Sequence, residues 1–377
     1  MLGVDGLDLE RTALGDMVHR RPKALVMMFS GARAVLSTSP LNGGYREDLT
    51  AVFNFDEKPE GGTYCALKAP TYEAHLRLAA TGLELDPGRV SGLSTAASME
   101  NAAMTVETAQ GLSVTAIVTA GVEVNGSRAG DPAAYDESRL GLRFAPGTIN
   151  IILAINACLP QFALARAAIT GAEAKAAALQ ELMAGSNYSS GIATGSGTDG
   201  MILVSDPAAG LRLTDAGTHS KLGELIGRAV KRGVTEALRR ETGLSPAGQH
   251  SMVRRFKRYG LTEEFLWQEY QRLLKEQPGC ARCSKPLFLK RLQRIDCLDP
   301  LVTASAVYIH LLDERQWGLL SRSESEAAAL AVLERIGRDL GLEWPLFPGD
   351  QTSNHPERLL VKTFARFIIG YIMNGTD

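Results

Sequence analysis

The sequence has 377 residues, enough for about two or three domains that each bury a core, so folding needs no disulfide or metal. Hydrophobic residues make up 45% and charged residues 22%, as in globular proteins, whereas the 38 glycines exceed the usual share of roughly 7%. Forty basic and 42 acidic residues leave a net charge of −2. This charge gives no general attraction for phosphate polymers, so we expect no nucleic-acid partner.

The sequence predicts a cytoplasmic protein without a membrane partner. Its first residues lack the basic start and apolar core of a signal peptide. The longest apolar stretch, Ile149 to Leu159, contains asparagine and is too short to cross a bilayer. The five cysteines are scattered and do not form the framework of a secreted disulfide protein.

The first part of the chain has the patterns of a largely antiparallel or mixed sheet with packed helices. Short β-branched runs punctuated by glycine lie in 24–56 and 103–122, and 105–116 fits an antiparallel hairpin around Gly111. In 148–156 the odd-numbered apolar residues share one face of a central strand, with Asn150 on the other face. Helices are expected at 171–183 and 218–241, and a strand-loop-strand segment at 191–205. Hairpins followed by late helices indicate the α+β class.

After Gly243 the β-branched runs disappear and helical patterns follow one another to the end. Thr262 is expected to cap a helix, and Asp299-Pro300 to form the N-cap and first residue of another. Further helices are expected near 323–340 and 356–373. We therefore predict an α+β domain over 1–243 and an all-helical C-terminal domain over 244–377.

The segment 191–200 alternates glycines with the hydroxyl residues Thr194, Ser196 and Thr198 and then reaches Asp199. Glycines let the backbone approach a ligand closely, so the loop is compatible with an oxyanion hole, a phosphate cradle or a simple hairpin turn. It lacks the lysine of a Walker loop and a strand is expected after it, which weakens the nucleotide-binding interpretation.

The segment 215–227 opens the last helix of the first domain. At 100° per residue, His219 falls on the side of Leu222 and Ile226, which predicts a histidine that points into the core, as a satisfied core residue, general base or ligand. Lys221 and Glu224 lie together on the polar side, either as a surface pair or facing a substrate.

Two further groups have both structural and chemical interpretations. Asp131, before Pro132, suits a helix N-cap or a carboxylate that orients a water or histidine, and it follows a turn that contains Asn125. Cys280 and Cys283 have the spacing of half a metal site but no second close pair, so packing is favoured over zinc or redox chemistry.

The chain resembles the adenosylcobinamide amidohydrolase family of cobalamin salvage. The matching stretches occur in family order between about residues 20 and 240, and the last two are long enough to be specific: Ser94–Ala97, Thr119–Val122, Arg128–Pro132, Gly147–Leu153, Tyr188–Asp199 and Leu213–Gly227. Ser196 stands where the family loop usually has threonine, so the hydroxyl is retained. The helical tail from about 245 is not covered.

The resemblance implies hydrolysis of the amide that joins a corrin propionate to aminopropanol, giving adenosylcobyric acid. Such a site must supply an activated water or hydroxyl, donors for the developing oxyanion and an acid for the leaving nitrogen. The candidate catalytic residues are His219, Asp131, Glu224 and Asp199. The candidate substrate-binding residues are Thr194, Ser196, Thr198, Asn150, Lys221, Ser220 and Asn125.

The resemblance implies a corrinoid substrate that carries its own cobalt, so no cofactor or metal of the protein is expected. The glycine turn and the start of the helix at His219 are expected to meet around one scissile carbonyl. The alternatives are a corrinoid-binding protein without turnover and a phosphotransferase that holds a nucleotide in the glycine-rich loop. The sequence leaves homo-oligomerisation open.

Overall fold

The computed structural model describes residues 10–58, 67–133, 136, 147–276, 282–342 and 356–374. The chain divides into two compact units, Met1–Ser245 and Pro246–Asp377. The first unit combines mixed sheets with helices and the second is helical, which confirms the predicted α+β class followed by an all-helical region.

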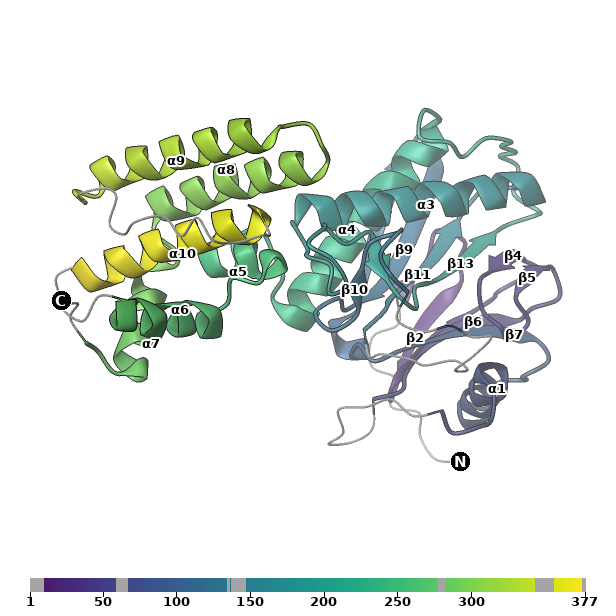
Figure 1. The fold of residues 1–377 in the computed structure, drawn as a ribbon. Helices are drawn as coiled ribbons and strands as arrows, with labels where there is room; N and C mark the ends of the chain where they lie inside the picture. Colours follow the sequence, from purple (N-terminus) through teal and green to yellow (C-terminus); the bar gives the residue numbers. More distant parts are fainter. Residues whose placement is uncertain are drawn as a thin grey trace. The chain divides into compact units, whose positions relative to one another are not determined.

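The first unit contains two main sheets that pack face to face (Figure 1). In spatial order, one consists of β1 (Glu10–Arg11), β2 (Met17–Arg21), β3 (Ala24–Met28), β6 (Ala51–Asp56) and β7 (Val90–Thr95). The other consists of β5 (Gly44–Arg46), β4 (Ala34–Ser37), β13 (Gly200–Ser205), β11 (Ile149–Ile155), β9 (Leu112–Ala120) and β8 (Ala103–Ala109). A small ladder joins β10 (Gly126–Ser127) to β12 (Gly195–Ser196).

Each main sheet contains one parallel pair, and a helix connects its two strands. The first pair is β6 and β7, joined through α1 (Tyr72–Gly82), and the second is β11 and β13, joined through α3 (Gln161–Glu181). The other described pairings in both sheets are antiparallel, including the predicted hairpin of β8 and β9. The sheets are therefore mixed.

The pleat of the strands explains the layers. On β11, Ile149, Ile151 and Leu153 belong to a core shared with α3 and α4 (Lys221–Thr242), as the alternation predicted. Ile152 and Ala154 point the other way, into the core between the sheets. A third core lies between α1 and the outer face of the first sheet. Figure 1 shows the resulting order of α1, two sheets, and the α3–α4 layer.

The ends of α4 follow from its sequence. Ser220 is the N-cap and accepts from the Gly223 amide at 2.9 Å, and Gly243 ends the helix with a left-handed φ of 71°. The helix therefore begins at Lys221 rather than at 218. A short 3₁₀ helix, η1 (Met99–Asn101), lies near the other end of α4, where Glu241 accepts from the Ser98 amide at 3.1 Å.

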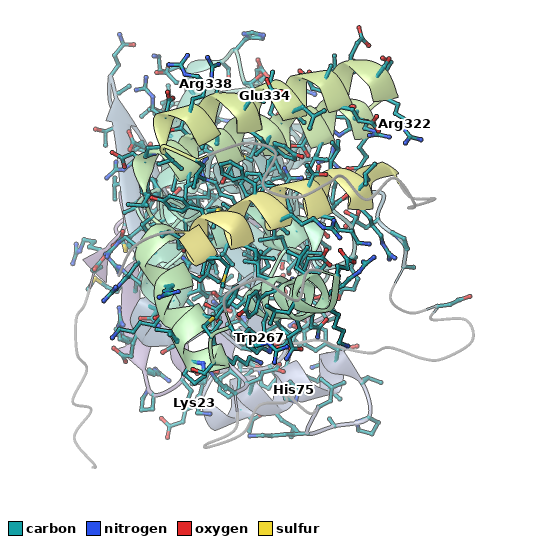
Figure 2. The ribbon with its side chains drawn as sticks, turned by 60° about the vertical axis from the view of Figure 1, so that its left-hand side comes forward. Lys23, His75, Trp267, Arg322, Glu334 and Arg338 are labelled. Atoms are coloured by element: carbon teal, nitrogen blue, oxygen red, sulfur yellow. The ribbon has the colours of Figure 1, made fainter. Side chains whose placement is uncertain are left out.

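The second unit encloses its own apolar core. It consists of α5 (Met252–Phe256), η2 (Lys257–Tyr259), α6 (Glu263–Glu276), α7 (Lys285–Ile295), α8 (Asp299–Gln316), α9 (Arg322–Asp339) and α10 (Pro356–Asn374). Thr262 caps α6 by accepting from the Phe265 amide at 3.1 Å, as predicted. The expected N-cap Asp299 instead lies in the first turn of α8, because the backbone becomes helical one residue earlier, after Leu298. Figure 2 shows Arg322 and Arg338 toward opposite ends of α9.

Within these ranges no single helix has both the length and the hydropathy needed to cross a membrane. α7 and α8 reach the threshold only when the two are counted together across a bend of 86°.

Candidate active site

The glycine-rich turn is held by the small β10–β12 ladder, just before β13 begins. Gly126 pairs with Ser196 and Ser127 with Gly195, and the Thr194 amide donates to the Ser127 carbonyl at 2.9 Å. A strand follows the turn, as predicted. The turn therefore lies at the edge of the second sheet where β11 and β13 start.

Asp199 organises this turn. One carboxylate oxygen, Oδ1, accepts from the Ile149 amide at 2.9 Å and from the Ser196 hydroxyl at 2.6 Å. The other, Oδ2, accepts from the Ser196 amide at 3.0 Å and from the ammonium group of Lys175 on α3. A carboxylate has about four lone-pair positions, and these four donors use them. Asp199 therefore holds Ser196, Lys175 and the start of β11 together, and its predicted catalytic role is not tested.

Lys175 is a charged side chain of this cluster that the sequence analysis did not single out. Its side chain is 14% exposed, and Asp199 is its ion-pair partner among the described residues. An ammonium group has three hydrogens, so two remain after the bond to Asp199. The sequence feature that could have indicated it is a lysine within an alanine-rich run, Ala174-Lys175-Ala176-Ala177, next to the buried residues of α3.

The hydroxyls of the turn have different surroundings. Thr194 Oγ1 accepts from the Ala129 amide at 2.9 Å, and Thr198 Oγ1 donates to the Gly147 carbonyl at 3.1 Å. Thr148, before β11, also bonds to Thr198. The backbone amides of the three hydroxyl residues donate within the protein, to Ser127, Asp199 and Ser196. These three amides are therefore already used, and an oxyanion here would bind mainly to side-chain donors.

Asn125 lies next to the turn, and its predicted role in substrate binding is not tested. Its amide nitrogen donates to the Gly147 carbonyl at 3.1 Å, and its oxygen accepts from the Tyr188 hydroxyl at 2.9 Å. A Cβ on Gly197 would lie 3.3 Å from the Asn125 oxygen. Tyr188 is a second residue of this cluster that the sequence analysis did not single out.

Asp131 belongs to a neighbouring turn. Its Oδ2 accepts from the Arg128 amide at 2.8 Å and from the Ser186 hydroxyl at 2.6 Å. Partial burial raises the pKa of this carboxyl, but hydrogen bonds from Ser186, Ser189 and the Arg128 backbone outweigh it, so the pKa is lowered. A low pKa makes a weak proton acceptor. The N-cap interpretation stays a prediction, because most of the residues that follow Ala133 lie outside the described ranges.

The prediction that His219 points into the core is wrong. The side chain is exposed, because α4 begins only at Lys221 and His219 precedes the N-cap. The Ser220 hydroxyl is used for capping: it accepts from Gly223 and donates to the Gly217 carbonyl at 2.8 Å. The structure does not test the catalytic role predicted for His219, and because the side chain is exposed we assign it no role in the proposed reaction.

Lys221 and Glu224 form the predicted pair, and Arg228 adds a second cation 2.7 Å from Glu224. The hydrogen bond from Lys221, then the charges of Arg228 and Lys221, lower the pKa of the Glu224 carboxyl. The Lys221 and Arg228 side chains are more than half exposed. This arrangement is that of a solvated surface pair.

The expected meeting of the glycine turn and the start of α4 is not seen in the described contacts. The turn reaches α3 through Lys175, whereas the segment before α4 reaches it at Thr170, which donates to the Ala216 carbonyl at 2.7 Å. A Cβ on Gly217 would meet Arg166 at 3.2 Å. Since a helix rises about 1.5 Å per residue, the contacts at Arg166 and Thr170 lie about 13.5 Å and about 7.5 Å from Lys175 along α3. The predicted site residues therefore form two clusters.

Asn150 lies between the two sheets. Its amide nitrogen donates both hydrogens, to the Asn54 oxygen and to the Ser94 carbonyl, each at 2.8 Å, and the side chain is buried. Asn54 in turn donates to the Thr119 hydroxyl at 2.7 Å. This geometry supports a structural role, and the predicted contact with a corrin amide is not tested.

No group of three or more His, Cys, Asp or Glu side chains in the described part of the chain could hold a metal ion. Cys280 lies outside the described residues, so the predicted Cys280–Cys283 half-site cannot be placed. Cys283 is a free cysteine.

The chain is similar to known proteins in sequence, and its fold was compared with solved structures. The PH0078 protein from Pyrococcus horikoshii OT3 has a solved structure that covers 63% of this chain and 89% of its own, with 14% identity and a TM-score of 0.30. The uncharacterized protein MJ1613 of Methanocaldococcus jannaschii is 35% identical over 235 residues, which are 59% of this chain and 88% of that protein. The family model for adenosylcobinamide amidohydrolase matches residues 9–246. The match spans more than half of the chain, and the chain belongs to the adenosylcobinamide amidohydrolase family.

Proposed function

We propose that this protein hydrolyses the amide between a corrin propionate and aminopropanol in adenosylcobinamide, giving adenosylcobyric acid. Membership of the family supports this reaction, and the observation that carries it is the cluster of Lys175, Asp199 and Ser196. The cluster lies within the matched residues and is assembled from α3 and the glycine turn, so the family region builds it alone. The substrate brings its own cobalt, and the scheme assigns no metal to the protein.

An amide resists hydrolysis because its carbonyl is stabilised by resonance and its amine is a poor leaving group. The carbonyl oxygen gains negative charge when a water attacks, and donors directed at that oxygen lower the barrier. Lys175, with hydrogens left after its bond to Asp199, is the donor we assign to this oxygen. The single hydrogen of the Ser196 hydroxyl is donated to Asp199, so Ser196 acts by fixing that carboxylate. Asp199 in turn holds Lys175 in place before the substrate arrives, so little reorganisation is needed.

The test is the release of aminopropanol when the purified protein is incubated with adenosylcobinamide, with adenosylcobyric acid identified by mass spectrometry. Lys175→Met should lower kcat/KM by about 100-fold or more, because it removes a charged donor from the developing oxyanion. Lys231→Met is the matched control, since Lys231 pairs with Glu181 on the surface. Ser196→Thr should keep activity and Ser196→Ala should lose it. Corrinoid binding without release by the wild-type protein would instead identify a binding protein.

A further inference from the structure

A second polar group, outside the predicted site residues, lies where β6 and β7 end. Glu57 directly follows β6, and its backbone amide donates to the Thr95 carbonyl at 2.9 Å, which fixes it beside the last residue of β7. The Glu57 side chain is 9% exposed. Among the described residues no lysine or arginine forms an ion pair with it. A nearly buried carboxylate without a permanent cation is costly, and such costs concentrate at functional sites.

His75, labelled in Figure 2, belongs to α1. It lies against this carboxylate. Its Nδ1 accepts from the Lys68 amide at 2.9 Å, so in the neutral ring the hydrogen sits on Nε2. Nε2 is 2.8 Å from Glu57 Oε1, although the two atoms are not aligned for a hydrogen bond. The histidine is 2% exposed and held from both sides. It therefore limits where the Glu57 carboxylate can lie.

Tyr72 and Ser94 complete this group. The Tyr72 hydroxyl and Ser94 Oγ are 2.6 Å apart. Burial first, and also the charge of Glu57, raise the pKa of Tyr72 against the opposing effect of Ser94. The phenol is thus a neutral hydroxyl whose pKa is affected by the charge of Glu57.

The group is connected to the Asp199 turn through the interior of the domain. Asn150 on β11 donates to the Ser94 carbonyl, and the next residue back, Ile149, donates to Asp199. A Cβ on Gly200 would lie 2.6 Å from Leu93, so β7 approaches the start of β13 closely. The ends of β6 and β7 and the beginnings of β11 and β13 therefore share one edge of the two-sheet stack.

The carboxylates named in the sequence analysis are poor proton acceptors. Asp199 already accepts from four donors. Asp131 and Glu224 have lowered pKa values because of the donors around them. Glu57 differs from all three, because the described polar contact of its carboxylate is His75 Nε2 at 2.8 Å, and this pair is not aligned as a hydrogen bond.

We propose that Glu57 is the general base of the amide hydrolysis, with His75 as its positioning residue. This inference rests on the proposed function. Glu57 takes a proton from water while the water oxygen bonds to the carbonyl carbon and the π electrons move to the carbonyl oxygen. When the C–N bond breaks, the same proton passes from Glu57 to the leaving nitrogen. One amide and one water become one carboxylic acid and one amine, and Glu57 returns to its carboxylate form.

The experiment compares Glu57→Gln, Glu57→Ala and the control Glu73→Gln in the full-length protein with adenosylcobinamide. Glu73 lies on the exposed side of α1, paired with Arg77 at 2.9 Å. Glu57→Gln should lower kcat by about 10²- to 10⁴-fold, the usual contribution of a general base, with KM changed by less than about threefold. Formate should restore part of the turnover of Glu57→Ala, which a purely structural role would not allow. Glu73→Gln should behave as wild type.

His75 is tested by two substitutions. His75→Gln keeps a side-chain N–H for Glu57 and should retain more kcat than His75→Ala, with similar KM values. Circular dichroism and the melting temperature verify that each variant folds. If Glu57→Gln does not fold, Glu57→Asp replaces it. The displaced carboxylate of Glu57→Asp should then lower kcat by about tenfold or more. A wild-type protein that turns over while Glu57→Gln or Glu57→Asp keeps full activity would overturn the role of Glu57 alone. A wild-type protein without turnover would overturn the proposed function as well.

Discussion

Gly195 and Asp199 lie so close together that no side chain fits between them. A Cβ built on Gly195 would be 2.2 Å from Asp199 Oδ2 and 2.7 Å from the Lys175 nitrogen. Gly195→Ala must therefore displace the carboxylate, the ammonium group or both. Because misplacement by about 1 Å can cost 100-fold in rate, we expect a loss of about that size in kcat/KM. Gly210→Ala is the control, since nothing lies within 4 Å of its added Cβ. Equal activities of the two variants would contradict the assigned cluster.

His219→Ala should leave both fold and turnover nearly unchanged. The side chain is exposed and precedes α4, so we expect a change in unfolding free energy within about 0.5 kcal/mol and in kcat/KM within about twofold. Aminopropanol release measures the second quantity. A loss of more than about tenfold would place His219 at the reacting centre after all.

Asp16→Asn should destabilise the first unit strongly. Asp16 is fully buried and receives hydrogen bonds from the Arg33 guanidinium at 2.8 Å and from the Ser30 amide at 2.7 Å. Removing one partner of a buried ion pair costs about 3–5 kcal/mol, and we expect the lower end of this range because Asp206 lies 3.7 Å from Arg33 and compensates part of its charge. Asp48→Asn is the control, since its pair with Arg46 is exposed. Urea unfolding of both variants decides, and similar midpoints would show that the Asp16 pair contributes little.

Asp131 should make stability depend on pH in the acid range. Its pKa in the folded protein lies below the ordinary value of 3.8. The carboxylate therefore adds stability above pH about 4, and this contribution disappears as the pH falls through the lowered pKa. The difference in unfolding free energy between wild type and Asp131→Asn should be larger at pH 7 than at pH 3. A difference independent of pH would show that the hydrogen bonds, not the charge, are responsible.

Removal of residues 246–377 should leave a folded and active protein. Each unit encloses its own core, and the family match ends at residue 246. We expect a single cooperative unfolding transition for residues 1–245 and turnover within about twofold of the full-length protein. Loss of turnover with an intact fold would assign the helical unit a direct part in the reaction.

Local patterns predicted much of the fold, because they depend on near neighbours. The alternation in β11, the hairpin of β8 and β9 and the cap of α6 at Thr262 need only a few residues each. Helix starts were less certain: α3 begins at Gln161 rather than 171, and the sequence analysis does not predict α1. The predicted start of α4 was three residues too early, and this was enough to place His219 in the core when it is exposed. Ser220, a suitable N-cap, could have indicated the correct start.

The site could be predicted only in part, for a physical reason. The turn at 194–199 is one continuous segment, so its glycines and hydroxyls are visible in the sequence. Lys175 reaches it from α3, and Glu57 meets His75 across 18 positions of chain. Contacts of this kind depend on how strands pair and helices cross over, which no local pattern specifies.

The bond between Asn54 and Asn150 determines more than local packing. Two flat apolar surfaces can slide, but a slip of one pleat, about 7 Å, would strand both amides without partners at a cost of about 1–3 kcal/mol each. The amide pair thus fixes the register of one sheet relative to the other. Because β6 leads to Glu57 and β11 begins beside Asp199, the same amide pair also fixes the relative position of these two chain segments from inside the domain.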